Sequence, residues 1–305
     1  MAHQHTPALQ EKSKGHSLGL VFMIGIVINI VYLLAEALAG LFCNSMGLLS
    51  DAGHNLSDVV GLVLAFTAYK LLGVQSSRRF TYGYKKATIL ISLLNAMILS
   101  VAVVFIVVES IQKLINPDQL KGGVISIVAA IGVLVNGFTA YLLLKNRRRD
   151  LNVRGAFVHM VADAMVSVGV VISGVVIYFT EWSMLDGLIG LAVAVVIIFS
   201  TWDLIRATIR LALDGVPMEV DYDQVIASFL SVDGVIDMHH LHIWALSTTQ
   251  NALTAHVQIR DLSEMENIKA QLKSKLDELG ISHATLEFES LDFQCTDRND
   301  DTPED

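Results

Sequence analysis

The chain has 305 residues, of which 53% are hydrophobic and only 17% charged, and its formal net charge is −9. Because a soluble domain is normally about a quarter charged, this composition argues against an ordinary soluble protein. The acidic balance, without a basic patch interleaved with aromatic residues, argues against a nucleic-acid partner. Two cysteines, Cys43 and Cys295, with no CxxC pair cannot form a disulfide framework.

Long apolar stretches fill most of the chain up to about residue 212. A helix that spans a bilayer needs about 20 mainly apolar residues. Six stretches meet this length: 18–42, 46–72, 87–115, 123–144, 155–180 and 184–205. The first is too long for a signal peptide and has no small-residue cleavage site after it, so it is predicted to be retained. The sequence therefore predicts a membrane α-helical bundle of six transmembrane helices.

Lysine and arginine are concentrated in two of the predicted loops. The loop after the second stretch holds Arg78, Arg79, Lys85 and Lys86, and the loop after the fourth holds Lys145, Arg147, Arg148, Arg149 and Arg154. The loops after the first and fifth stretches hold none. Since basic loops remain in the cytoplasm, both termini are predicted to be cytoplasmic.

Beyond residue 212 the composition becomes ordinary and the hydrophobic period changes. The pattern predicts helices at 221–230 and 263–279, and strands at 234–246, 252–260 and 283–290. This order predicts a small α+β domain with its helices on one face of a sheet.

Two matched pairs of polar residues interrupt the apolar stretches. His54 and Asp58 lie four positions apart in the second stretch, and His159 and Asp163 lie four apart in the fifth. Residues at this spacing share one helix face. An aspartate at the centre of a membrane helix costs about 2.5–3.5 kcal/mol on insertion scales, unless it faces a cation, water or a partner. Two imidazoles and two carboxylates form a set that tetrahedral zinc accepts, so these four residues are predicted to bind a divalent metal.

The same ligands suit Zn²⁺, Co²⁺, Ni²⁺ or Fe²⁺, whereas Cu⁺ calls for sulfur. A single buried His or Asp often serves only as a hydrogen-bonding group between helices, but two matched pairs favour a metal site. Asp51, one turn before His54, fits either an exit path or a helix-start role. Four further polar residues are expected to form interhelical hydrogen bonds: Asn29, Glu36, Asn95 and Asn136.

Several segments resemble the cation diffusion facilitators, over residues 18 to 291. They are Ser50 to Asp58 (SDAGHNLSD), Phe80 to Ala87 (FTYGYKKA), Asn152 to Asp163 (NVRGAFVHMVAD) and Met238 to Trp244 (MHHLHIW). The resemblance implies a homodimeric metal/proton antiporter that exports metal from the cytoplasm and has a ferredoxin-like cytoplasmic domain. It also implies that His rather than Asp at position 54 accompanies a preference for zinc over cadmium.

Two departures make the chain similar to compact bacterial members of that family. Residues 73–86 contain no His, Asp or Glu, so an additional loop site of some members is not expected. Residues 145–154 contain no His, whereas many animal zinc members have a His-rich loop there. The resemblance further suggests a charge interlock between Lys85 and Asp214, although the two residues could equally be unrelated surface charges.

A second group of potential ligands lies in the C-terminal region. It comprises His239, His240, His242, His256, His283, Glu287 and Glu289. On a regular strand His240 and His242 share one face, and His239 points to the other. The resemblance implies metal binding by His239, His256 and Glu289, with His283 as a fourth ligand; Cys295 is left out because the second cysteine of a tail pair is missing. The alternative is a set of exposed or structural histidines.

These expectations divide the chain into four parts. They are a cytoplasmic N-terminal tail (1–17), a transmembrane transport domain (18–212), a cytoplasmic metal-binding and dimerisation domain (213–291) and an acidic tail (292–305). The expected protein is a multi-pass transporter of a bacterial inner membrane rather than an enzyme, with no cofactor. Its expected partners are zinc and protons as substrates, a second copy of the chain and the lipid bilayer, but no nucleic acid.

Three rival functions use the same residues differently. A passive metal channel would need only loose ligands and no proton coupling. An intramembrane metalloprotease would need an open coordination position and a motif such as His-Glu-x-x-His, which the sequence lacks. A metal sensor would use only the C-terminal region, and the intramembrane residues would then have no purpose.

Overall fold

The computed structural model describes residues 8–42, 46–115, 124–180, 184–293 and 295. At 8–17, 40, 46–51, 54, 124–129, 170, 173–174, 177–178 and 186 it describes the backbone alone. The chain forms two compact units. The first contains the described residues up to Gln75 together with Leu90–Arg206, and the second contains Ser76–Ile89 together with the described residues from Ala207 onward.

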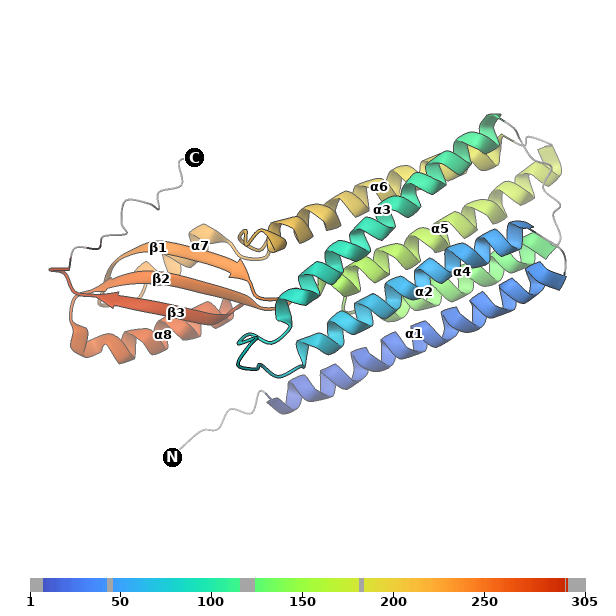
Figure 1. Ribbon diagram of the computed structural model, residues 1–305. Coiled ribbons are helices and arrows are strands. Elements are labelled where there is room, and N and C mark those ends of the chain that lie inside the picture. The colour runs from blue at the N-terminus through green and yellow to red at the C-terminus, as the bar shows by residue number, and fades with distance from the viewer. Residues whose placement is uncertain (1–7, 43–45, 116–123, 181–183, 294, 296–305) are drawn as a thin grey trace. The chain divides into compact units, whose positions relative to one another are not determined.

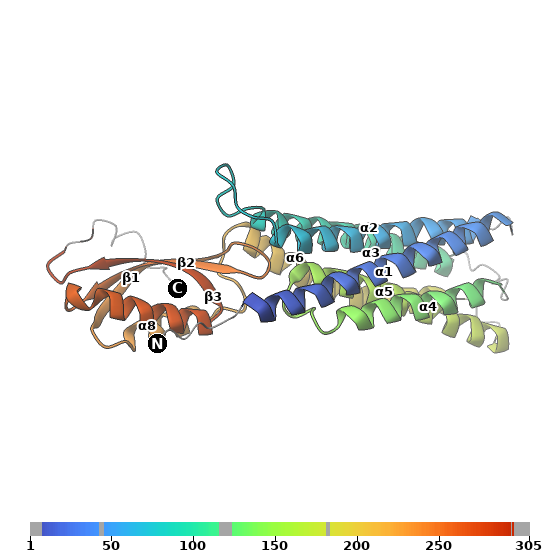
Figure 2. The same ribbon diagram turned by 90° about the horizontal axis from the view of Figure 1, so that it is seen from below.

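Six long helices build the first unit and lie beside one another (Figures 1 and 2). They are α1 (Ala8–Phe42), α2 (Met46–Leu72), α3 (Lys85–Ile115), α4 (Val124–Leu143), α5 (Leu151–Thr180) and α6 (Leu185–Ala212). Each apolar stretch of the sequence thus forms a helix, as predicted. The first turn of α3 and the last turns of α6 belong to the second unit.

Four segments of these helices are long and apolar enough to cross a membrane. They are Leu18–Ala39, Asn55–Leu72, Lys85–Ile115 and Gly187–Ala212; a fifth apolar segment, Ala130–Leu143, is shorter. This count refers to the described residues and rests on length and composition. A membrane domain with several spans is therefore confirmed, whereas the number six stays a prediction.

Large apolar side chains fill the centre of the helix bundle. Phe22 of α1, Leu62 of α2, Leu143 of α4 and Met160 of α5 are each at most 1% exposed and belong to one cluster. Polar groups join the helices at specific points. Asn29 Nδ2 of α1, for example, donates a hydrogen bond to the hydroxyl of Thr139 of α4 (3.0 Å), as expected from the sequence.

The second unit is a mixed three-stranded sheet with two helices. Its elements are α7 (Tyr222–Leu230), β1 (Val235–Ala245), β2 (Asn251–Ile259), the 3₁₀ turn η1 (Leu262–Glu264), α8 (Met265–Glu278) and β3 (Ile281–Glu289). The strand order is β1-β2-β3, with β1 antiparallel and β3 parallel to β2. Helix α8 lies along one face of the sheet (Figure 2), and α7 contacts both β1 and α8.

Local sequence explains where these helices begin. Asp221 precedes α7, and its carboxylate accepts a hydrogen bond from the backbone N–H of Gln224 (3.0 Å). Asp261 precedes η1 and accepts a hydrogen bond from the backbone N–H of Ser263 (2.8 Å). Such caps satisfy backbone groups that a helix leaves without an internal partner. Hydrogen bonds from the backbone and side chain of Ser263 also lower the pKa of Asp261.

Strand β1 contains a bulge in the middle of its histidines. His239 is paired with His256 and His242 with Thr254, so two residues of β1 stand opposite one residue of β2. His240 has a φ of 51°, in the left-handed region that few residues other than glycine adopt. His240 and His242 lie together, as predicted, with their Nε2 atoms 3.4 Å apart. The prediction that His239 points to the opposite face is wrong, because the bulge re-aims the side chains so that both His239 and His240 approach His256.

The first turn of α3 is bonded to the rest of the second unit. Lys86 Nζ forms an ion pair with Asp214 and donates hydrogen bonds to the carbonyls of Leu211 (3.3 Å) and Ala245 (3.4 Å). The charge interlock was expected to involve Lys85, but it is the neighbouring Lys86 that contacts Asp214.

Candidate metal centres

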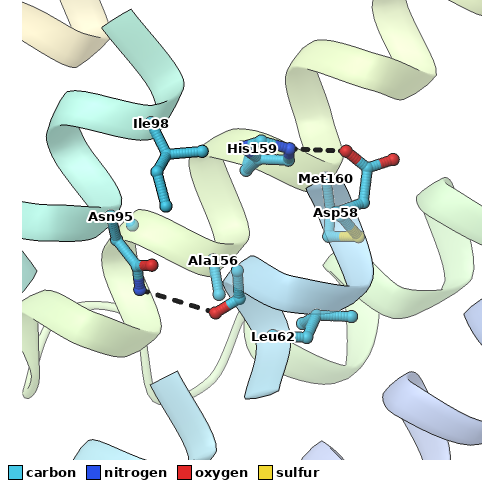
Figure 3. Close-up of a pocket in the computed structure, with 9 residues that line it drawn as sticks. Asp58, Leu62, Asn95, Ile98, Ala156, His159 and Met160 are labelled. Atoms are coloured by element: carbon cyan, nitrogen blue, oxygen red, sulfur yellow. Dashed lines mark hydrogen bonds and ion pairs between the residues drawn. The ribbon is translucent and has the colours of Figure 1, made fainter. Parts of the chain in front are cut away.

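Helices α2 and α5 bring three of the four predicted intramembrane ligands together. His159 Nε2 lies 2.6 Å from Oδ1 of Asp58 and 3.5 Å from Oδ2 of Asp163. The side chains of Asp58, His159 and Asp163 are 0%, 8% and 6% exposed. Figure 3 shows the His159 ring on α5 directed at the carboxylate of Asp58 on α2. One ligand atom from each of the three residues lies within 4.8 Å of the others.

The fourth predicted ligand, His54, has its backbone in α2 one turn before Asp58, but its side chain lies outside the described residues. The backbone of Asp51 also lies in α2, and its side chain likewise lies outside the described residues. His159 and Asp163 lie on α5, whose first turn is stabilised by a buried aspartate. Asp150 is buried and accepts a hydrogen bond from the backbone N–H of Asn152 (2.7 Å), which fixes the first turn of the helix.

A small cavity of about 10 Å³ adjoins Asp58 and His159. Asn95 of α3 lines it, and its Nδ2 donates a hydrogen bond to the carbonyl of Gly61 (3.5 Å; Figure 3). Asn95 Oδ1 has no hydrogen-bond partner among the described residues. The interhelical hydrogen bond of Asn95 was expected; its position beside the ligands was not. The sequence offered one signal: Asn95 is the one amide side chain among residues 87–108, the part of the third stretch without charged residues.

A second buried polar group stands next to the ligand-bearing part of α2. Glu36 of α1 is 3% exposed and accepts hydrogen bonds from Asn55 Nδ2 and from the hydroxyl of Tyr32 (3.1 Å). Asn55 directly follows His54 in the chain. Glu36 thus forms the interhelical hydrogen bond expected of it, and it joins α1 to the turn of α2 that carries the predicted ligands.

The chemistry of the buried cluster suits a divalent cation. Two carboxylates within reach of one imidazole would repel each other in a low-dielectric interior, and a cation balances them. Imidazole nitrogen and carboxylate oxygen are both common zinc ligands.

The sheet of the second unit carries another cluster. His239 of β1, His256 of β2, Glu289 of β3 and Cys295 after β3 each place a ligand atom within 4.8 Å of the other three. His256 Nδ1 lies 2.9 Å from Glu289 Oε1 and 3.4 Å from Cys295 Sγ. His239 Nε2 lies 3.4 Å from Glu289 Oε2. The structure thus brings together the three ligands expected from the resemblance.

His283, the fourth ligand expected there, lies elsewhere on the sheet. It is paired with Ala252 rather than with the part of β2 that holds His256. Its Nε2 lies 3.4 Å from the hydroxyl of Tyr82. Cys295, rather than His283, lies with the other three residues. No local pattern favoured it, because its location depends on how the chain continues after β3.

Two models of protein families match the chain. The cation efflux transmembrane domain matches residues 22–211, and the cytoplasmic domain of cation efflux proteins matches residues 217–290. The first of these alone covers more than half of the chain.

Curated relatives match nearly the whole length. A protein of Bacillus subtilis named cadmium, cobalt and zinc/H(+)-K(+) antiporter is 30% identical over 95% of this chain and 92% of its own length. The metal cation efflux system protein CzcD of Cupriavidus metallidurans is 33% identical over 87% of this chain and 85% of its own length. The zinc transporter ZitB of Escherichia coli is 30% identical over 95% and 93%.

Proposed function

The chain belongs to the cation efflux family, and we propose that it exports a divalent transition metal, zinc above all, from the cytoplasm in exchange for protons. One observation carries the proposal beyond family membership. Asp58, His159 and Asp163, from two different helices, are buried with their ligand atoms within 4.8 Å of one another. The names of the relatives, which include zinc, cadmium and cobalt, support the choice of metal.

The transported ion binds to His54, Asp58, His159 and Asp163. Two imidazoles and two carboxylates complete a tetrahedral set, and the two negative charges balance the ion. His54 belongs to this set because it lies one turn from Asp58 on the same helix face. The contact between α2 and α5 supports the proposal, since both pairs need these two helices.

Transport proceeds by alternating access around this single site. The metal enters from the cytoplasm when both imidazoles are neutral and both carboxylates are ionised. When the site opens to the other side, protons compete for the same lone pairs, because metal ligands must be deprotonated. Protonation then expels the metal and returns the site to the cytoplasmic side, without any covalent chemistry.

The proposed architecture follows the expectations from the sequence. Residues 18–212 cross a bacterial inner membrane six times, with residues 1–17 and the parts from 213 onward in the cytoplasm. The mixed sheet with α7 and α8 on one face supports a ferredoxin-like relationship for residues 213–291. The match to a cytoplasmic domain of cation efflux proteins supports a homodimer. The acidic segment 292–305 follows this domain.

The cluster on the sheet binds a second, regulatory metal ion through His239, His256 and Glu289. Their proximity supports this assignment. A protein that only senses metal would use this site alone, yet the buried ligands of α2 and α5 would then cost stability without any return. A channel fits the buried residues less well, because it needs no closed set of ligands. A protease also fits less well, because its metal must keep one coordination position open for water.

The deciding experiment is zinc flux in proteoliposomes with an imposed pH gradient. Zinc should accumulate in vesicles whose lumen is more acidic than the medium, and the lumen should become less acidic as zinc enters. Collapse of the gradient with a protonophore should stop accumulation. Zinc movement that follows only its own gradient, with no change in lumenal pH, would instead identify a channel.

A further inference from the structure

We propose that Cys295 supplies a thiolate as the fourth ligand of the sheet site, so that the metal is held by two imidazoles, one carboxylate and one sulfur. The inference rests on the second metal site of the proposed function. It adds the identity of the closing ligand, a residue that sequence reasoning left out in favour of His283.

The distances fit a metal ion at the centre of the cluster. Around tetrahedral zinc, with bonds of about 2.0–2.3 Å, neighbouring ligand atoms stand about 3.3–3.8 Å apart. Cys295 Sγ lies 3.4 Å from His256 Nδ1, and His239 Nε2 lies 3.4 Å from Glu289 Oε2. All four ligand atoms lie within 4.8 Å of one another, so shifts of about 1 Å bring them to the bonding positions.

A buried carboxylate independently indicates a cation here. The side chain of Glu289 is 3% exposed and contacts only imidazoles: Oε1 lies 2.9 Å from His256 Nδ1, and Oε2, 3.4 Å from His239 Nε2, accepts no hydrogen bond from the described residues. A buried charge is costly unless it is paired or bound to a metal. Two imidazoles and a thiol surround this carboxylate, and all three are metal ligands in their deprotonated forms.

The bulge of β1 adds a third observation. His239 faces His256 across the ladder with ring centroids 5.4 Å apart, and His240 also approaches His256, at 4.9 Å. A regular strand would have turned one of the two histidines to the opposite face. The left-handed conformation of His240 costs about 1–2 kcal/mol, and strained residues of this kind concentrate at sites that bind ligands.

The sulfur ligand defines which metals the site accepts. Thiolate favours soft and borderline ions, so the site should retain zinc and cadmium and reject manganese and magnesium. The carboxylate and imidazoles of the transport site lack this preference. The two sites therefore differ in selectivity, and the sheet site responds to the softer metals even when harder ones are present.

Cobalt spectroscopy of the full-length protein in detergent tests the assignment. The chain has two cysteines, so Cys43→Ser leaves Cys295 as the one thiol. Addition of Co²⁺ to Cys43→Ser should produce the near-ultraviolet charge-transfer band of a thiolate bound to cobalt. The band should disappear in Cys43→Ser/Cys295→Ser, and one equivalent of Zn²⁺ at the site should abolish it by displacement.

Matched variants separate this inference from the transport site. Asp58→Ala in the Cys43→Ser background should keep the band, because it removes a ligand of the other site. His283→Ala should also keep it, whereas His256→Ala should lose it. Absence of the band in Cys43→Ser, or its loss in His283→Ala but not in His256→Ala, would overturn the inference and leave the transport mechanism untouched.

Discussion

Asp58 is the residue on which the proposed transport site depends most directly. Its side chain is 0% exposed and lies 2.6 Å from His159. Asp58→Asn keeps the size of the side chain but removes a negative charge that balances the metal. Loss of one partner from a buried charged pair costs about 3–5 kcal/mol, which corresponds to more than about a hundredfold in affinity. We expect no measurable zinc transport in proteoliposomes.

Asp163→Ala should have the same effect, because it removes the other carboxylate of the cluster. Asp203→Ala is the matched control, since Asp203 is an exposed carboxylate of α6 outside the cluster. Zinc transport by Asp58→Asn at the rate of the Asp203 variant would remove Asp58 from the site.

His54→Asp tests the ligand whose side chain lies outside the described part of the structure. The variant keeps four ligands but replaces an imidazole by a harder oxygen donor and adds a negative charge. Zinc should still be transported, while larger or harder ions should gain relative to it, Cd²⁺ because of its size and Mn²⁺ because of its hardness. The acid limb of the pH profile should move to lower pH, because an imidazole, which ordinarily titrates near about 6.5, is replaced by a carboxylate that ordinarily titrates near about 3.9.

The measurement is flux with zinc and cadmium in competition at several pH values. Unchanged selectivity would show that His54 does not discriminate between zinc and cadmium, and it would leave the proposed roles of Asp58 and Asp163 as they are.

At the scale of secondary-structure elements, the bulge of β1 makes a prediction about stability. His240 has a φ of 51°, which glycine adopts without strain and a β-branched residue adopts poorly. In the absence of metal, His240→Gly should stabilise β1 by up to about 1 kcal/mol, and His240→Val should destabilise it by at least as much. Hydrogen exchange of the β1 amides in the full-length protein measures both.

The matched control for this prediction is His242→Gly. His242 resumes the pairing of β1 with β2 after the bulge, so glycine there should destabilise the strand by about 0.5–1 kcal/mol. If glycine had the same effect at 240 and 242, the conformation of His240 would not be strained.

The ion pair between Lys86, at the beginning of α3, and Asp214, two residues after α6, gives a second prediction at this scale. Lys86 and Asp214 are 44% and 61% exposed, so their coupling should not exceed about 1 kcal/mol. Lys86→Ala and Asp214→Ala should each weaken transport or dimerisation, and the double variant should lose less than the sum. Lys85→Ala is the matched control and should change little; strict additivity of the Lys86 and Asp214 effects would argue against the pair.

The elements themselves could largely be predicted from the sequence, because hydrophobic periodicity determines them. The second apolar stretch coincides with α2, and the predicted helix 221–230 differs from α7 by one residue. Three of the four predicted ligands meet because i, i+4 spacing fixes their common helix face.

The remaining features depend on tertiary pairing rather than on local pattern. The bulge at His240 arises from the register of β1 against β2, which a single strand does not encode. Which of the neighbouring residues Lys85 and Lys86 faces Asp214 depends on how α3 is rotated about its axis, and the local sequence does not determine that rotation. Cys295 reaches His256 only through the path of the chain after β3.

At the scale of the whole molecule, the loops make the orientation testable. A cysteine at Arg148 in the Cys43→Ser background should not react with a membrane-impermeant reagent added outside intact cells, because the basic loops are predicted to face the cytoplasm. A cysteine at Ser183, in the loop predicted from the sequence after the fifth apolar stretch, should react. Reaction at 148 from outside would reverse the proposed orientation.

The pairing of α2 with α5 also has a consequence for biosynthesis. Asp58 meets His159, which follows it by 101 residues, and a ribosome adding about 5–20 residues per second needs about 5–20 s to make that length. During this interval α2 must be accommodated without its partner, although Asn55–Leu72 is the least apolar of the four long segments. Helix α1 is already present and holds α2 through Glu36 and Asn55. We therefore expect the α1–α2 hairpin to assemble first, and substitution of Glu36 should lower the yield of membrane-inserted protein.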